Sequence, residues 1–195
     1  MAILKDKNAT APNRAMALRF ILHFVGDLHQ PLHASDNDDH GGNCVPLKYF
    51  RRNPYLRKGS YAPNLHHIWD TEMVESEMLG ADPSEFAETL DAQFSSYFAA
   101  WQQGGIRVDA WAWESHEHAV DTAYGALPVK VAVEPAGVSV KSCTDDDNIG
   151  DRMLHKHIVV GSAYQDISQS VIEERLALAG IRLAMILNDV AKTTP

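Results

Sequence analysis

A long apolar repeat near the C-terminus constrains the fold of this chain more than any other feature. From about Ser162 to Ala191, apolar residues recur every three or four positions. They are Val171, Ile172, Leu176, Ala179, Leu183, Ile186, Leu187 and Val190. This spacing is typical of a helix that buries one face against other elements, so we expect a helical domain packed around it.

Four further segments are typical of helices, namely residues 13–30, 64–79, 82–104 and 109–124. The first is predicted to bury a wide apolar face, formed by Met16, Leu18, Ile21, Leu22, Val25 and Leu28, and to end at Pro31. Asn64 is a predicted N-cap. Asp82, Pro83 and Glu85 form the pattern of a capping box with proline at the first helical position.

The segments between these helices are predicted to be mostly loops. Residues 34–43, 51–63 and 125–150 are rich in polar residues, glycine or proline, and short strands are expected at 45–50 and 129–133. With 45% hydrophobic and 22% charged residues, the composition excludes a disordered or low-complexity chain. The sequence therefore predicts one all-α, multi-helix domain over residues 1–195, with at most a short β-hairpin.

The charge balance limits the possible partners. The chain has 17 Lys and Arg against 26 Asp and Glu, a formal net charge of -9, so a broad basic surface for nucleic acid is excluded. Phosphate binding would need a local source of positive charge. No run reaches the roughly 18 apolar residues of a membrane span, and the opening MAILKDKNAT lacks the apolar core of a signal peptide.

The only two cysteines are Cys44 and Cys143, which are too few for a disulfide scaffold and have no CxxC partner. They could form one long-range disulfide in an oxidising compartment or remain buried thiols. The sequence leaves both alternatives open.

Two His-xxx-Asp pairs are the strongest candidates for chemistry. His23 and Asp27 lie four residues apart on the first predicted helix, and His66 and Asp70 repeat this spacing on the second. Side chains at this spacing share a helix face, with Cβ atoms about 5–6 Å apart. Pro31 bends the chain after Asp27, so we expect His33 to turn back toward the same region. Imidazole and carboxylate groups together suit zinc.

A single pair of this kind is usually only a surface ion pair. The setting favours a metal site, because both pairs lie within otherwise apolar helical segments, where polar groups need partners. Asp36, Asp38, Asp39 and His40 also bear ligand-type side chains, but they lie on a glycine-containing loop that is poorly suited to hold metal geometry.

Several motifs resemble one known family. The segments HFVGDLHQPLH, GGN at 41–43, NLHHIWDT at 64–71, WAWES at 111–115 and AGIRLAMILN at 179–188 resemble the secreted zinc-dependent single-strand nucleases and 3′-nucleotidases of the S1/P1 type. These enzymes are related to bacterial zinc phospholipase C. The order and spacing of the motifs agree over most of the chain.

The resemblance implies an all-α fold with three zinc ions in a cleft. His23 and Asp27 match ligands of the first zinc, and Asp27 would also bridge to the third. His33, His66 and Asp70 match ligands of the second. In such a site the metals activate water and neutralise phosphate charge, so Asp27 would act in catalysis through the bridged metals. The positive charge that an acidic chain needs would then come from the ions.

The resemblance also implies that part of the family's ligand set lies upstream of this sequence. Only the set His33, His66 and Asp70 is complete, so residues 1–195 are interpreted as the C-terminal part of a nuclease domain. The implied function is hydrolysis of single-stranded DNA and RNA to 5′-nucleotides, with 3′-nucleotidase activity, by a secreted or periplasmic monomer. The alternatives are a phospholipase C-like phosphodiesterase and a non-catalytic fragment. We expect weak activity, if any, from the 195-residue chain.

Other polar and aromatic residues are assigned supporting roles. His29 and His67 are interpreted as neighbours of the ligands or surface groups, and the pairs His116/His118 and His155/His157 as surface groups. Gly41 and Gly42 are expected to allow a tight turn, with Asn43 near the cleft. Packing roles are expected for Trp101, Trp111 and Trp113.

Overall fold

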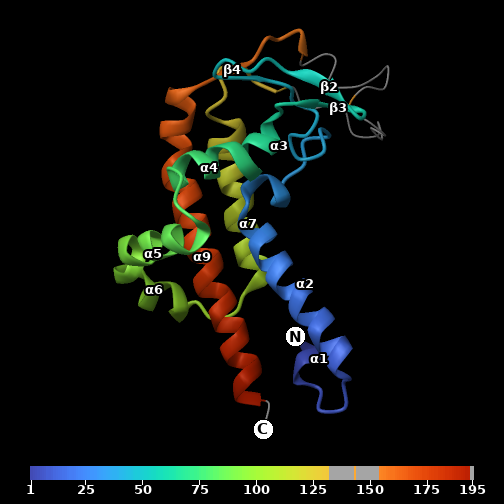
Figure 1. The fold of residues 1–195 in the computed structure, drawn as a ribbon, viewed down its shortest axis with the longest axis vertical. Coiled ribbons are helices and arrows are strands. Elements are labelled where there is room, and N and C mark those ends of the chain that lie inside the picture. Colours follow the sequence, from blue (N-terminus) through green and yellow to red (C-terminus); the bar gives the residue numbers. More distant parts are fainter. Residues whose placement is uncertain (132–142, 144–153, 194–195) are drawn as a thin grey trace.

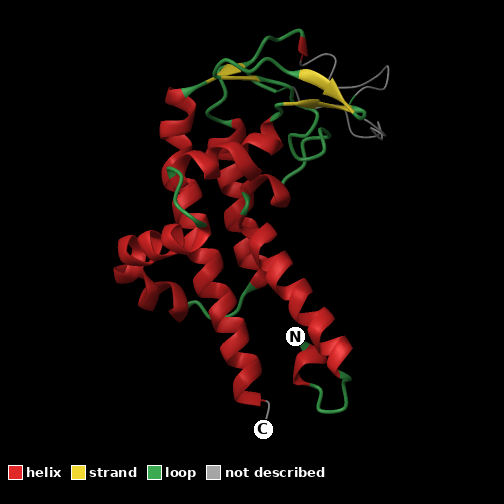
Figure 2. Cartoon of the chain, viewed as in Figure 1, coloured by secondary structure: helices red, strands yellow, loops and turns green. Residues whose placement is uncertain are grey.

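The C-terminal repeat forms one long helix, α9 (Ser162–Thr193), around which the other helices assemble. The computed structural model describes residues 1–131, 143 and 154–193, most of them helical (Figure 2). Helix α2 (Ala11–His29) packs against both α9 and α7 (Val108–His118) (Figure 1). The predicted all-α class is therefore confirmed.

Local capping determines where the helices begin. The Thr10 side chain accepts a hydrogen bond from the Asn13 N–H at 3.4 Å at the start of α2. Asp82 forms the predicted capping box with Glu85 before α5 (Pro83–Phe94), which continues through η3 (Ser95–Tyr97) into α6 (Phe98–Gln103). The Asn64 side chain accepts from the His67 N–H at 2.8 Å, which confirms the predicted N-cap.

Two predicted helices contain a wider turn that the sequence did not indicate. The helix after Asn64 consists of α3 (Leu65–His67), the π-helical segment η2 (Ile68–Glu72) and α4 (Met73–Met78). Likewise, α7 continues into a second π-helical segment, η4 (Ala119–Tyr124). Short π-helical segments within helices are frequent at functional sites. In this chain, η2 contains Asp70.

The strands are short and lie at one end of the molecule (Figure 1). Strand β1 (Lys48–Tyr49) pairs in parallel with β4 (Val159–Val160), in the register Lys48 to Val159 and Tyr49 to Val160. The predicted strand at 45–50 is therefore reduced to two residues. Of the strand expected at 129–133, residues 129–131 are irregular and the rest lies outside the described residues.

The prediction of a loop over 51–63 was wrong, because part of it forms an antiparallel hairpin. Strand β2 (Tyr55–Arg57) pairs with β3 (Ser60–Ala62), with Arg57 opposite Ser60. The two residues between them, Lys58 and Gly59, have φ values of 49° and 81°. Positive φ at both central residues is typical of a type I′ turn, whose twist matches that of the strands it joins.

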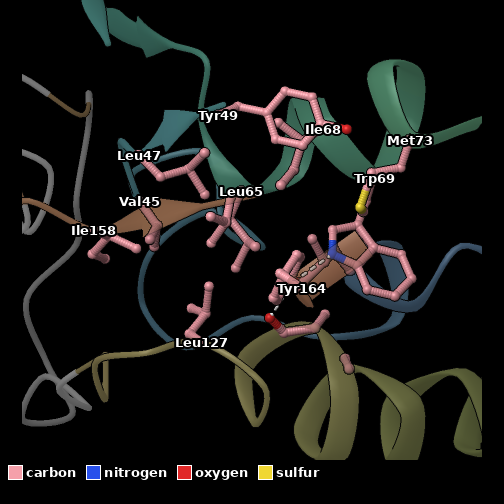
Figure 3. Packing of buried hydrophobic residues seen from close by; sticks show 14 of the residues in the cluster. Val45, Leu47, Tyr49, Leu65, Ile68, Trp69, Met73, Leu127, Ile158 and Tyr164 are labelled. Carbon is pink, nitrogen blue, oxygen red and sulfur yellow. Dashed lines mark hydrogen bonds between the residues drawn. The ribbon is translucent and has the colours of Figure 1, made fainter. Parts of the chain in front are cut away.

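The main hydrophobic core lies beneath this end of the molecule (Figure 3). Leu65, Ile68 and Trp69 are fully or almost fully buried in it. The Trp69 indole N–H donates to the Tyr164 hydroxyl at 2.8 Å, and that hydroxyl donates to the Ala123 carbonyl at 2.7 Å. These contacts fix the orientation of η2 relative to α9, and thereby the direction in which Asp70 faces the surface.

The apolar face of α2 is only partly covered. Val25 packs with Trp111 and Ile186 in a second buried cluster, with Ile21 and Leu28 at its margin. The predicted apolar face is present, but it is buried only in part, since Met16, Leu18 and Leu22 are exposed. Helix α1 (Ala2–Lys5) lies against α2 and α9, where the Lys5 ammonium pairs with the Asp189 carboxylate at 2.6 Å.

The two cysteines form a disulfide that joins residues 99 positions apart in sequence. Of the two alternatives left open by the sequence, the structure shows the bridge between Cys44 and Cys143. Both residues belong to the main buried cluster. Among the described residues, no helix combines the length and apolar character needed to cross a membrane.

Candidate metal centre

The candidate site begins on the last two turns of α2. His23 and Asp27 share one face of this helix, and the His23 Nε2 atom lies 3.1 Å from Asp27 Oδ2. The His23 side chain is 66% exposed and that of Asp27 is 34% exposed. The first predicted pair is therefore in contact and accessible to ligands.

The chain reverses direction directly after α2. Gln30 ends the helix, and its side-chain oxygen accepts a hydrogen bond from the Leu32 N–H. The short 3₁₀ helix η1 (Pro31–Ala34) then brings His33 between two carboxylates, as the position of Pro31 predicted. His33 Nδ1 lies 3.8 Å from Asp27 Oδ2, and His33 Nε2 lies 3.2 Å from Asp70 Oδ1.

The second pair comes from α3 and η2. His66 Nε2 lies 3.2 Å from Asp70 Oδ2. The other ring nitrogen of His66, Nδ1, donates a hydrogen bond to the Gly41 carbonyl at 2.8 Å. The Gln30 side-chain amide donates to Asp70 Oδ1 at 2.7 Å. Both members of the pair are thus oriented by a second contact, as metal ligands commonly are.

The glycine pair allows the loop to approach His66 closely. Gly41 and Gly42 have φ values of 60° and 85°, which other residues rarely adopt. A Cβ atom on Gly41 would lie 2.6 Å from the Leu32 carbonyl oxygen, and one on Gly42 would lie 3.2 Å from Leu65 Cβ. The predicted tight turn is confirmed. Asn43, expected near the cleft, instead donates to the His40 carbonyl at 2.9 Å within the loop.

Hydrogen bonds determine the charge state of the second pair. Burial by itself favours neutral Asp70, but hydrogen bonds with His33, His66 and Gln30 outweigh this effect and hold its pKa well below the usual range. Burial also disfavours charged His66, yet the contacts with Asp70 and the Gly41 carbonyl raise its pKa overall. The arrangement therefore favours a positive charge, either a protonated His66 ring or a cation, beside the ionised Asp70 carboxylate.

The residues present fit a divalent cation. Ligand atoms of His33, His66 and Asp70 all lie within 4.8 Å of one another. Because His66 donates through Nδ1, its neutral form would present the lone pair of Nε2 to the Asp70 carboxylate, and a cation between them would satisfy both. Ligands around tetrahedral zinc lie roughly 3.3 Å apart, close to the 3.2 Å separations seen in this structure.

The structure brings all five predicted site residues into one continuous chain of contacts. The order of contact is His23, Asp27, His33, Asp70 and His66. The acidic loop is used differently. Asp39 is fully buried and accepts hydrogen bonds from the Gly42 N–H and the Tyr124 hydroxyl, both at 2.8 Å. Its carboxylate stabilises the loop and does not face the site.

Some polar residues beside the site were missed or misjudged from the sequence. His29 is not a surface group but is 2% exposed, and its Nδ1–H donates to the Val25 carbonyl at 2.7 Å. His116 is half-buried, with Nδ1 lying 2.8 Å from the Ser35 hydroxyl at the end of η1. His67 pairs with Glu72 at 2.7 Å. The role of Gln30 had no sequence signal beyond its place before Pro31.

A buried polar cluster supports the end of α2 from the side opposite the candidate site. Arg175 donates to the His29 carbonyl at 3.3 Å, to Glu114 at 3.0 Å and to the Ser115 hydroxyl at 2.6 Å. Arg182 also pairs with Glu114, at 2.7 Å. Glu114 and Ser115 lie in the WAWES motif and Arg182 lies in AGIRLAMILN, so these motifs mark the cluster.

The tryptophans have three different environments. Trp111 is 3% exposed and contacts Arg182 and His29, as a packing role requires. Trp101 packs against aromatic rings of its own helical segment. Trp113 is 64% exposed, so the expectation of a packing role was wrong for this residue.

Comparison with known proteins agrees with this arrangement. The family model described as S1/P1 Nuclease matches residues 1–192. Nuclease S1 of Aspergillus oryzae is 31% identical over 183 residues, which cover 90% of this chain and 54% of that protein. Endonuclease 2 of Arabidopsis thaliana is 29% identical over 178 residues, which cover 91% of this chain and 52% of that protein.

Nuclease P1 of Penicillium citrinum is 28% identical over 199 residues, which cover 96% of this chain and 62% of that protein. The chain thus spans little more than half the length of the curated relatives it matches. The match to the family model nevertheless extends over almost the entire sequence, through every segment that contributes to the candidate site. This chain belongs to the S1/P1 nuclease family.

Proposed function

We propose that this chain belongs to a zinc-dependent phosphodiesterase that hydrolyses single-stranded DNA and RNA to 5′-nucleotides and also removes 3′-phosphates. The observation that supports this proposal most is the group His33, His66 and Asp70, which could hold a metal ion. His33 of this group contacts Asp27, and Asp27 in turn contacts His23. Ligand-type side chains therefore continue beyond the three residues of a single ion site.

The chain's own residues have distinct roles in this proposal. His33, His66 and Asp70 would hold one zinc ion, and the Gly41 carbonyl and the Gln30 amide fix the orientation of His66 and Asp70. His23 and Asp27 would contribute to an adjacent ion site, and Asp27 would act in catalysis through the metals, since its carboxylate contacts both His23 and His33. When bound, zinc supplies activation of water and neutralisation of phosphate charge.

The substrate class and location follow from the family and from the disulfide. The curated relatives are named nucleases or endonucleases, which favours nucleic acid over phospholipid as the substrate. The Cys44–Cys143 bridge suits an oxidising compartment, so we propose a secreted or periplasmic enzyme. We propose that it acts as a monomer and that residues 1–195 form the C-terminal part of the nuclease domain.

Hydrolysis of denatured DNA tests the proposal. The purified chain is stripped of metal, supplied with zinc, and assayed on a labelled single strand and on the same strand in a duplex. Zinc content is measured in parallel, so that slow turnover does not conceal binding. We expect bound zinc and at most weak, chelator-sensitive cleavage that favours the single strand. Cleavage that persists in chelator, or hydrolysis of a choline phospholipid without cleavage of DNA, would refute the proposal.

The Asp27→Asn variant, made in the complete nuclease of which residues 1–195 are proposed to form the C-terminal part, tests the role of this carboxylate. An amide cannot replace a carboxylate between two ions, so cleavage should fall more than about 10-fold. Asp91→Asn, which changes an exposed carboxylate on α5, is the matched control and should retain full activity. Equal activity of the two variants would exclude Asp27 from catalysis.

A further inference from the structure

The basic residues of this acidic chain are unevenly distributed. Residues 40–69 contain none of the 26 acidic residues and five of the 17 basic ones. The five are Lys48, Arg51, Arg52, Arg57 and Lys58. A chain with a net charge of -9 therefore has one segment that is strongly positive. Local clusters of this kind attract polyanions even when the protein as a whole does not.

The fold places this positive segment at the end of the molecule where the strands lie (Figure 1). Arg51, Arg57 and Lys58 are exposed, and they form no ion pair with any residue in the part of the chain that the structure describes. Arg52 pairs with Glu72 at 2.8 Å and lies over the Tyr49 ring. Lys156 is a further exposed basic residue. It lies in the turn before β4, and β4 pairs with β1, which contains Lys48.

Aromatic rings accompany these charges. Tyr55 is 57% exposed and Phe50 is 47% exposed. Tyr55 and Arg57 are alternate residues of β2 and therefore share one face of the hairpin. Phe50 and Lys58 have φ values of 51° and 49°, a conformation that is uncommon for residues other than glycine, asparagine and aspartate. Phe50 and Lys58 are thus exposed at positions where the backbone adopts an uncommon conformation.

A hollow of about 270 Å³ lies beside the hairpin. Lys48, Asn53 and His157 contribute polar groups to its lining, and Pro46, Leu47 and Pro54 contribute apolar surface. A recess that combines apolar walls with donors suits a planar, polar ring such as a nucleobase. Lys48 belongs both to the positive segment and to the lining of the hollow, which therefore lies at the same end of the molecule as the other basic residues.

This surface is anchored to the candidate metal centre. The Ser60 hydroxyl of β3 donates to the Asn43 carbonyl at 3.3 Å, in the loop whose Gly41 carbonyl binds His66. The Asn64 side-chain amide donates to the Tyr61 carbonyl at 2.8 Å, while its oxygen caps the helix that contains His66. The hairpin and the metal centre therefore share the same loop and the same helix cap.

We propose that the basic hairpin surface, defined as Lys48, Phe50, Arg51, Tyr55, Arg57, Lys58 and Lys156, binds the backbone and bases of single-stranded nucleic acid. The charged groups contact successive phosphates, and the exposed rings stack on bases, a combination typical of single-strand binding. The inference rests on the proposed function only for the fate of the bound strand, which passes from this surface to the metal centre. An anionic membrane fits less well, because it requires neither stacking rings nor a lined recess.

Binding of a fluorescently labelled oligothymidylate, measured by anisotropy in chelator, tests this proposal without any cleavage. The double variant Arg57→Gln/Lys58→Gln should bind about 10-fold more weakly, and the slope of log affinity against log salt should decrease by about 1.4. The control Arg19→Gln/Arg107→Gln has the same change in net charge at exposed positions on α2 and before α7, and should leave affinity unchanged. Equal weakening in both double variants would overturn the proposal.

Two further variants separate stacking from apolar contact and guard against local unfolding. Tyr55→Leu retains apolar bulk but removes the ring, so we expect about 5-fold or greater loss of oligonucleotide affinity. Arg51→Gln lies outside the hairpin and should weaken binding even if hairpin variants unfold. Sedimentation with phosphatidylserine vesicles that is retained in Tyr55→Leu, together with unchanged oligonucleotide binding, would assign the surface to membranes and refute the proposal.

The binding experiment also distinguishes failure of this inference from failure of the proposed function. Because chelator is present, oligonucleotide binding that is lost in the hairpin variants supports the surface even if the protein proves unable to cleave DNA. Zinc-dependent cleavage by a protein whose oligonucleotide affinity is insensitive to all of these variants would support the proposed function and overturn the hairpin surface.

Discussion

Two histidines of α2, six residues apart, have opposite environments. His23 is largely exposed, and its Nε2 faces the Asp27 carboxylate. His29 is buried, its Nδ1–H donates to the Val25 carbonyl, and its Nε2 accepts a hydrogen bond from Arg182 at 3.0 Å. Both ring nitrogens of His29 therefore form hydrogen bonds within the protein. The His23 ring is exposed, and its Nε2 faces the Asp27 carboxylate. Residue type alone does not identify a ligand; the neighbouring groups do.

The two faces of α2 are connected through its main chain. The Ser115 hydroxyl donates to the Leu28 carbonyl at 2.6 Å, and Arg175 donates to the His29 carbonyl. These contacts hold the last turn of the helix, from which Asp27 and then Gln30 project. We infer that the buried face determines stability and position, whereas the exposed face determines metal binding. Substitutions on the two faces should therefore affect different measurements.

The largest effect is expected from Arg175→Ala on the buried face. The substitution leaves several buried acceptors and part of the Glu114 charge without a partner, so the free energy of unfolding should fall by about 3–5 kcal/mol. Urea unfolding in the presence of chelator measures the change. Arg107→Ala, at an exposed position, is the control and should alter stability little. A loss of zinc affinity without any loss of stability would contradict the division between the two faces.

Asp70→Asn should produce the converse effect. It removes a carboxylate that contacts His33 and His66, so zinc affinity should decrease by more than roughly 100-fold, since even loss of an outer contact costs 10–100-fold. Titration of metal-free protein with zinc measures the affinity. The metal-free variant should lose some stability, because Asp70 accepts hydrogen bonds from His33, His66 and Gln30, but less than Arg175→Ala, because Asp70 lies at the surface. Unchanged zinc affinity would exclude this residue as a ligand.

The buried face should also show a specific dependence on pH. Burial is the main cause that lowers the pKa of His29 from 6.5 to about 4. The unfolded chain takes up a proton near pH 6.5 that the folded chain does not. The contribution of neutral His29 to stability is therefore complete above pH 6.5 and is lost as the pH falls toward 4. The expected loss is about 2 kcal/mol between pH 7 and 5.

Urea unfolding in chelator at pH 7, 6 and 5 measures this dependence. His29→Gln should be less stable at pH 7 but should lose less stability on acidification. His155→Gln changes an exposed histidine and should retain the full dependence of the parent protein. The same slope in all three proteins would assign the acid sensitivity to other groups.

The sequence predicted the parts of the fold that depend on local signals. Helix starts at Asn64 and Asp82 follow from capping chemistry, which involves only residues close in sequence. Apolar periodicity predicted α9 almost to its observed bounds. The return of His33 toward Asp27 followed from Pro31, whose fixed backbone angle must end the helix. Each of these features requires no knowledge of distant residues.

Features that depend on distant contacts could not be predicted in the same way. The β2–β3 hairpin has Lys58 at a position where asparagine or glycine would have signalled a type I′ turn. Arg175 and Arg182 interrupt an apolar repeat, and only their burial against Glu114 reveals why. The wider turn of η2 depends on how Trp69 packs against Tyr164, 95 residues away.

The smallest effect is expected at Gln30, where the two faces of α2 meet. Its side chain links the end of the helix to the site, since its oxygen accepts from the Leu32 N–H and its amide donates to Asp70. Gln30→Ala should weaken zinc binding by about 10-fold through poorer orientation of Asp70. Gln30→Glu retains the acceptor but replaces the donor by a like charge beside Asp70. If orientation by the amide matters, both variants should bind zinc less tightly in titration. If instead Gln30→Glu binds more tightly, the added carboxylate has become a ligand, and the candidate site is less rigid than the contacts of Gln30 imply.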